Sequence, residues 1–236
     1  MVMDTSSLQV SSSRRAQEIG RTEIKLQARK KKLVEANAFV HSILSRNILF
    51  VGVSGSVSYV PEPDDDIDIF LIVKTNRLWK ELLKSFVIRR LRGSSDICLC
   101  LAFDNKYASQ YYRKEISGLA VKDSVNVVSI FGDEYYSRIL QSSPAVIANY
   151  PPMKVSLSEN LAYVNDSISW VSSLINIIFF VIGSSWLFLK QLYANKMLDR
   201  QGRDSERFRT VAGLHRFYLE TEKYRELDRK YREGSQ

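Results

Sequence analysis

The chain has 236 residues, of which 45% are hydrophobic and 25% charged. This composition excludes a disordered chain, and the length suits one well-formed core or one core with a small appendage. Lys and Arg number 34 against 26 Asp and Glu, giving a formal net charge of +8. Such a balance favours anionic partners, such as nucleotides, RNA or an anionic membrane surface, or reflects basic tails that keep the chain soluble.

The N-terminal residues 1–15 are rich in serine and lack the apolar stretch of a signal peptide, so we expect a mobile tail. The two cysteines, Cys98 and Cys100, are separated by one residue on an expected strand. That spacing is poor for a disulfide and does not match zinc-binding patterns. We therefore expect small buried thiols in a reducing compartment, and a cytoplasmic protein.

Hydrophobic periodicity and turn residues divide the chain up to residue 152 into alternating helices and strands. The order suggests an α+β fold with a small mixed sheet and flanking helices, in one domain over residues 16–152. A basic run at 29–32 is expected to be a solvated helix face. In chain order we expect a helix over 16–46, strands over 47–53 and 67–73, a helix over 75–92, a strand over 96–103 and an interrupted helix over 111–140.

Residues 153–236 are expected to form a helical C-terminal region. Its stretch from Trp170 to Leu189 carries no charged residue and is long enough to span a bilayer. Three alternatives stay open: a membrane-inserted helix, a hydrophobic helix buried against the domain, or a bent hairpin around Gly183. Contact with a membrane through 170–189 is thus an alternative to a wholly cytoplasmic location. Residues 214–231 are expected to be an amphipathic helix.

The most informative stretch contains Gly55-Ser56, nine further residues and then Asp66-Ile67-Asp68-Ile69. Side chains at i and i+2 of a strand project to the same face, about 7 Å apart. Asp66 and Asp68 can therefore share two Mg²⁺ ions, with Mn²⁺ as a substitute, because such hard ions prefer carboxylate oxygens. Gly55 allows a phosphate to approach the backbone closely, and Ser56 adds a hydroxyl donor.

Other phosphate and metal motifs fail at specific positions. A P-loop requires Gly-Lys-Ser/Thr at the beginning of a helix, whereas Val57-Ser58-Tyr59 follows the turn here, and a dinucleotide fingerprint lacks the same helix. A calcium loop beginning at Asp64 would place Ile69 and Thr75 where Gly and Glu are required.

The Gly-Ser turn and the acidic-apolar-acidic-apolar strand resemble the signature of the polymerase β-type nucleotidyltransferase superfamily. The stretches GSVSYVPEPDDDIDIFLIVKTNRLW, DICLCLAF and IFGDEYYSRILQ are similar to successive blocks of uncharacterised prokaryotic nucleotidyltransferase-domain proteins. The resemblance implies that Asp66 and Asp68 bind metal and that Gly55 and Ser56 hold the phosphates of an NTP. It also implies a third carboxylate on a following strand, which helps to activate the attacking hydroxyl.

Asp96, at the beginning of the next strand, is the candidate for the third carboxylate, with Asp104 at the other end of that strand as a substitute. We therefore expect an Mg²⁺-dependent nucleotidyltransferase that transfers a nucleoside monophosphate from an NTP and releases pyrophosphate. Asp66 and Asp68 would hold both metal ions, and Asp96 would complete the shell of the acceptor-side metal and help to take the proton of the hydroxyl. The acceptor could be RNA, a protein or a small molecule. The alternative is a catalytically inactive nucleotide-binding or interaction module, attached to a membrane through 170–189.

Overall fold

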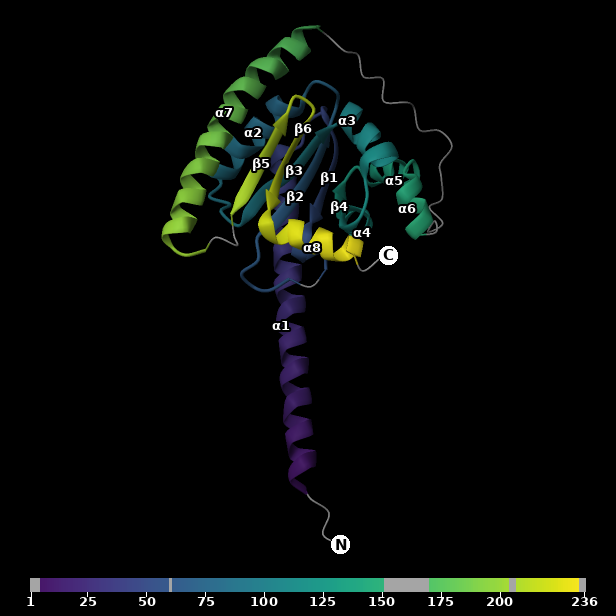
Figure 1. The fold of residues 1–236 in the computed structure, drawn as a ribbon, viewed down its shortest axis with the longest axis vertical. Coiled ribbons are helices and arrows are strands. Elements are labelled where there is room, and N and C mark those ends of the chain that lie inside the picture. Colours follow the sequence, from purple (N-terminus) through teal and green to yellow (C-terminus); the bar gives the residue numbers. More distant parts are fainter. Residues whose placement is uncertain (1–4, 60, 151–169, 204–206, 234–236) are drawn as a thin grey trace.

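The fold is built on one mixed sheet of six strands in the order β4-β1-β2-β3-β6-β5 (Figure 1). The computed structural model describes residues 5–59, 61–150, 170–203 and 207–233. β2 and β3 are parallel and all other neighbouring strands are antiparallel. The strands are β1 (Ile48–Ser54), β2 (Ile67–Val73), β3 (Ile97–Asp104), β4 (Val128–Phe131), β5 (Phe208–Gly213) and β6 (Arg216–Thr221).

Helices cover both faces of the sheet. They are α1 (Thr5–Ile43), α2 (Leu78–Leu91), α3 (Asn105–Gln110), α4 (Leu119–Val125), α5 (Asp133–Gln141), α6 (Pro144–Asn149), α7 (Trp170–Arg200) and α8 (Glu222–Glu233), with short η1 (Gly55–Ser58) and η2 (Tyr111–Glu115). The expected α+β class is confirmed, since helices and a mixed sheet pack together.

Two apolar clusters lie on opposite faces of the sheet, because alternate residues of β2 point to opposite sides. On one face, side chains of α1, α2 and α7 pack around Trp79 and Phe217. On the other face, residues from α3 to α6 surround Phe50, Phe70 and Tyr136, where the rings of Phe50 and Tyr136 stack with centroids 4.1 Å apart. Both faces of β2 are therefore buried against helices.

The expected tail over residues 1–15 is corrected in its secondary structure only, because α1 begins at Thr5; residues 1–4 lie outside the described residues. The sequence from Thr5 to Ile19 contains neither Gly nor Pro, so nothing in it interrupts a helix. The N-terminal half of α1 projects away from the sheet in Figure 1. A second correction concerns the interrupted helix over 111–140, since Val128–Phe131 forms the edge strand β4.

The helix expected over 214–231 is wrong in its first half. Residues 208–221 form the β5–β6 hairpin, and α8 begins only at Glu222. β6 pairs with β3, and the adjacent Phe217 and Tyr218 pack against the two opposite core clusters. A strand allows this arrangement and a helix does not, because neighbouring side chains alternate only in a strand. The expected helical C-terminal region therefore adds two strands to the sheet. The expected boundary at 152/153 lies outside the described residues.

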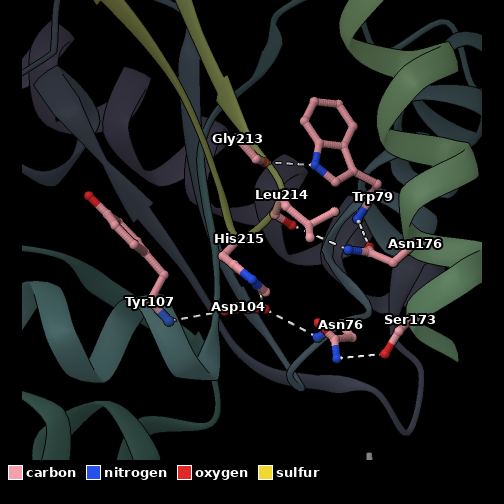
Figure 2. Close-up of polar contacts among 9 residues, drawn as sticks. All are labelled: Asn76, Trp79, Asp104, Tyr107, Ser173, Asn176, Gly213, Leu214 and His215. Carbon is pink, nitrogen blue, oxygen red and sulfur yellow. Dashed lines mark hydrogen bonds and ion pairs between the residues drawn. The ribbon is translucent and has the colours of Figure 1, made fainter. Parts of the chain in front are cut away.

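A buried polar cluster joins the end of β3 to the β5–β6 turn (Figure 2). Asp104 is fully buried, and its carboxylate accepts hydrogen bonds from the backbone N–H groups of Asn76 (3.1 Å) and Tyr107 (3.0 Å). Nδ1 of His215 lies 2.6 Å from the same carboxylate. Buried carboxylates need such partners, so Asp104 serves to hold the hairpin turn against β3.

The inner face of α7 is bonded to the domain through polar side chains (Figure 2). Asn176 accepts a hydrogen bond from the backbone N–H of Trp79 (2.9 Å) and donates one to the carbonyl of Leu214 (3.2 Å). Asn76 donates to the hydroxyl of Ser173 (2.9 Å), and the indole of Trp79 donates to the carbonyl of Gly213 (2.9 Å). One side of α7 is thus buried against α2 and the hairpin.

We expect Asn176→Ala to lower the free energy of unfolding by about 1–3 kcal/mol, because it leaves a buried N–H and a carbonyl without partners. Ser185→Ala, on the exposed side of the same helix, should change it by no more than about 0.5 kcal/mol. Urea unfolding of the two variants measures both values. Equal stabilities would show that the Asn176 hydrogen bonds do not hold α7 in place.

Candidate functional site

The Gly55-Ser56 turn packs directly against the carboxylate of Asp68. Gly55 follows the last residue of β1 and has φ +67°. Its neighbour Ser54 is paired with Asp68 across the two strands. A Cβ atom on Gly55 would lie 2.2 Å from Oδ2 of Asp68, closer than atoms can approach. Only glycine fits here without a shift of Asp68, and the turn and the acidic strand, separated by residues 59–66 of the sequence, form one site.

Basic residues of α1 hold the loop that connects the turn to β2. Arg29 donates to the carbonyls of Val57 (3.1 Å) and Ser58 (3.0 Å), and Lys32 donates to the carbonyl of Asp65. Lys32 is buried, whereas its neighbours at 30 and 31 are exposed. The expectation of a solvated face therefore holds for residues 30 and 31 of the basic run, whereas Arg29 and Lys32 hold the two ends of the loop.

The hydroxyl of Ser58 adds a further constraint within the turn, since it donates to the carbonyl of Gly55 (2.7 Å). Ser56 lies between them and is half-buried. In the part of the chain that the structure describes, its hydroxyl has no hydrogen-bond partner. A donor held in a rigid turn, beside backbone N–H groups, is suited to an anion.

Asp66 and Asp68 have different surroundings, although they lie two residues apart. Asp66 is exposed just before β2. Asp68 is inside the strand, where burial raises the pKa of its carboxyl to about 6, although the neighbouring thiols of Cys100 and Cys98 act to lower it. Partial burial, followed by the charge of Asp96, raises the pKa of Asp66, while Arg89 and Lys32 act in the opposite direction. Burial and neighbouring carboxylates thus disfavour the state in which both Asp66 and Asp68 are charged, and a bound cation would stabilise that state.

The two cysteines line the wall of the site next to Asp68. Cys98 is its register partner on β3, and a β-bulge inserts Cys100 between the partners of Ile69 and Phe70. Burial and the neighbouring Asp68 raise the pKa of Cys98 to about 12, so both thiols are neutral donors at pH 7. The cysteines are free, as expected. Their contact with Asp68 was not foreseen, because strand register cannot be read from the sequence.

Asp96 lies at the exposed beginning of β3, beside Asp66 rather than Asp68. The backbone N–H of Ile67 donates to the Asp96 carbonyl (2.7 Å), which sets the two strand entrances side by side. The Asp96 carboxylate accepts a hydrogen bond from the Ser95 hydroxyl (2.7 Å). The structure therefore brings Asp66, Asp68 and Asp96 to one end of the sheet. Asp104, the substitute, is at the opposite end of β3 and is bonded to His215, so it does not reach this site.

The residues of the site fit a hard cation that also binds phosphate. Within the described ranges, no group of three His, Cys, Asp or Glu side chains is arranged to hold a metal ion by itself. Mg²⁺ in phosphoryl-transfer sites takes one or two carboxylates and completes its shell with phosphate oxygens and water. Asp66 and Asp68 supply those carboxylates, and the turn at Gly55 lies next to Asp68 to receive the phosphates.

Comparison of the chain with protein-family models, with curated proteins and with solved structures found no match. The function of the chain is therefore inferred from the residues and contacts of the site itself.

Proposed function

We propose that the chain is a metal-dependent nucleotidyltransferase, which transfers a nucleoside monophosphate from an NTP to a hydroxyl acceptor and releases pyrophosphate. The observation that carries the proposal is the contact between the Gly55 turn and the Asp68 carboxylate. It brings together an anion-binding turn and a carboxylate whose negative charge is disfavoured by burial, and a metal-bound triphosphate needs both the turn and the carboxylate.

Each residue has a separate role in this proposal. Asp66 and Asp68 would hold Mg²⁺, or Mn²⁺ in its place. The Ser56 hydroxyl and the backbone N–H groups of the turn would bind the β- and γ-phosphates, which leave as pyrophosphate. A bound metal would neutralise charge at the phosphates and lower the pKa of the attacking hydroxyl. Arg89 donates to the carbonyls of Ser94 (3.1 Å) and Ser95 (2.7 Å), and its charge lowers the pKa of Asp66; it would supply a further positive charge near the phosphates.

In the transfer step, the acceptor oxygen forms a bond to the α-phosphorus while the bond from that phosphorus to the pyrophosphate oxygen breaks. The proton of the acceptor hydroxyl goes to a carboxylate. Asp96 is suited to accept it, because it is exposed to an incoming acceptor and lies next to Asp66.

A second candidate function is a nucleotide-binding module without turnover. The observation that favours it is the identity of the residues beside Asp68 on β3, which are Cys98 and Cys100. The resemblance implies a carboxylate on that strand, and neutral thiols do not act as general bases at pH 7. Both candidates bind an NTP, so only turnover separates them.

The test is incubation of the purified chain with each labelled NTP, Mg²⁺ or Mn²⁺ and a panel of RNA, protein and small-molecule acceptors. We expect pyrophosphate release in the parent, a loss of at least about 100-fold in Asp68→Asn, and a loss of about 100-fold in Asp96→Asn with nucleotide affinity unchanged. Asp64→Asn, in the exposed loop, is the control and should retain activity. Metal-dependent NTP binding without any product would support the binding module instead.

A further inference from the structure

The helix α7 has its small and polar residues on the inside. The side chains that face the domain are buried and include Ser172, Asn176 and Gly183. Gly183 is packed so closely that a Cβ would lie 2.8 Å from the ring of Trp79. Further along the helix, Gln191 accepts a hydrogen bond from the backbone of Thr210 in the hairpin (2.6 Å). The inner face is therefore bonded to the domain along its length.

The outer face of α7 is apolar and exposed. Its side chains recur every three or four residues, as one face of a helix requires. Trp170 is 77% exposed, Ile182 58% and Leu189 64%, and Leu174, Ile178 and Val181 continue the stripe between them. In the described part of the chain, α7 is the one helix long and apolar enough to cross a bilayer by length and composition. A stripe of this size on a protein surface marks a contact with something apolar.

The surroundings of this outer face are basic. α2 packs beside α7 and exposes Lys80 and Arg90, and Arg92, just after its end, is also exposed. The single acidic residue of α2, Glu81, is 2% exposed. α7 continues past its apolar stripe into Lys190, Lys196 and Arg200. Its single acidic residue, Asp199, forms an ion pair with Arg207 (2.5 Å). The apolar stripe is thus bordered by positive charge without exposed, unpaired acidic side chains on α2 or α7.

We propose that α7 and α2 form a docking surface for an anionic lipid bilayer, with α7 lying in the plane of the membrane and its outer face among the acyl chains. An apolar face bordered by Lys and Arg is the arrangement by which in-plane helices bind anionic membranes. Spanning would require α7 to leave α2 and the hairpin, which breaks the Asn176 hydrogen bonds and exposes the apolar ring of Trp79. A second copy of the chain on this face would bring two basic borders together and be repelled.

Co-sedimentation of the full chain with vesicles tests the proposal. We expect binding to phosphatidylcholine vesicles that contain phosphatidylglycerol to be at least about tenfold stronger than to phosphatidylcholine alone, and to weaken with salt. Ile178→Ser/Ile182→Ser should reduce it about tenfold. Val34→Ser, a 71% exposed apolar residue of α1, is the matched control and should bind as the parent does. Equal binding of both variants, or no binding to either vesicle, would overturn the proposal.

Tryptophan fluorescence distinguishes the other arrangements. The chain has three tryptophans, of which Trp79 is buried and Trp170 and Trp186 are on the exposed side of α7. We expect anionic vesicles to shift the emission to the blue in the parent but not in Trp170→Phe/Trp186→Phe. Adding Ile178→Trp to that double variant places a probe in the middle of α7, which should be quenched by lipids brominated near the headgroup. Quenching from the bilayer centre would show a span, and a blue shift on dimerisation without vesicles would show a second copy; either result overturns the in-plane proposal.

Discussion

Gly55→Ala will abolish metal-dependent nucleotide binding, whereas Gly93→Ala will leave it unchanged. Both glycines have positive φ, +67° and +63°, so alanine is strained by a similar amount at each position. A Cβ at Gly93 meets no atom within 4 Å, while at Gly55 it meets Oδ2 of Asp68 at 2.2 Å. The comparison therefore separates the collision with Asp68 from backbone strain.

The measurement is calorimetric titration of each variant with NTP in the presence of Mg²⁺, alongside urea unfolding. We expect each variant to lose about 1–2 kcal/mol of stability from strain, and Gly55→Ala to lose more than that because Asp68 must move. Its nucleotide affinity should fall at least about 100-fold, since the turn and the carboxylate separate. Unchanged affinity in Gly55→Ala would mean that the phosphates are not bound at this turn.

Asp68→Asn should stabilise the metal-free protein above pH 6. Burial raises the pKa of this carboxyl from 3.8 to about 6. Between about pH 4 and pH 6 the folded state therefore binds more protons than the unfolded state. The free energy of unfolding therefore falls as pH rises from about 4 to about 6. The difference between the folded and unfolded pKa of Asp68 corresponds to a loss of at most about 3 kcal/mol in the free energy of unfolding. Because Asp68 is partly exposed, we expect a loss of about 1–2 kcal/mol.

Urea unfolding of parent and Asp68→Asn between pH 4 and pH 8 measures this effect. The variant should show a smaller decrease, because Asp66, whose pKa is also raised, remains in it, and it should be more stable than the parent at pH 7. Mg²⁺ with NTP should then stabilise the parent and leave Asp68→Asn unaffected, because the ligand binds only a folded, ionised site. Asp64→Asn, in the exposed loop, should follow the parent at every pH. If the stability of the parent did not change between pH 4 and pH 6, the raised pKa assigned to Asp68 would be wrong.

The first half of the fold could be predicted because its signals are local. The expected strands at 47–53, 67–73 and 96–103 lie within one residue of β1, β2 and β3 at each end. Each has a run of apolar residues bounded by turn residues, which is sufficient to identify a buried strand. The contact of Gly55 with Asp68 was not predicted, because it depends on the register of β1 and β2, which these local signals do not fix.

The C-terminal half could not be predicted in the same way, because its structure depends on distant partners. Phe217, Tyr218 and Tyr224 have a helical spacing, yet the first two lie in β6, where β3 provides the hydrogen-bonding edge. The position of Cys98 beside Asp68 likewise depends on the parallel register of β2 and β3. Such non-local pairing overrides propensity, which is a weak signal.

The most direct test of the proposed site is calorimetric titration of the parent chain with an NTP, with Mg²⁺ and without any divalent ion, and the same titrations of Asp68→Asn. We predict saturable binding to the parent that requires the metal, and no binding to Asp68→Asn. Equal NTP binding with and without metal, or equal binding by parent and Asp68→Asn, would contradict a site built from Gly55, Asp66 and Asp68.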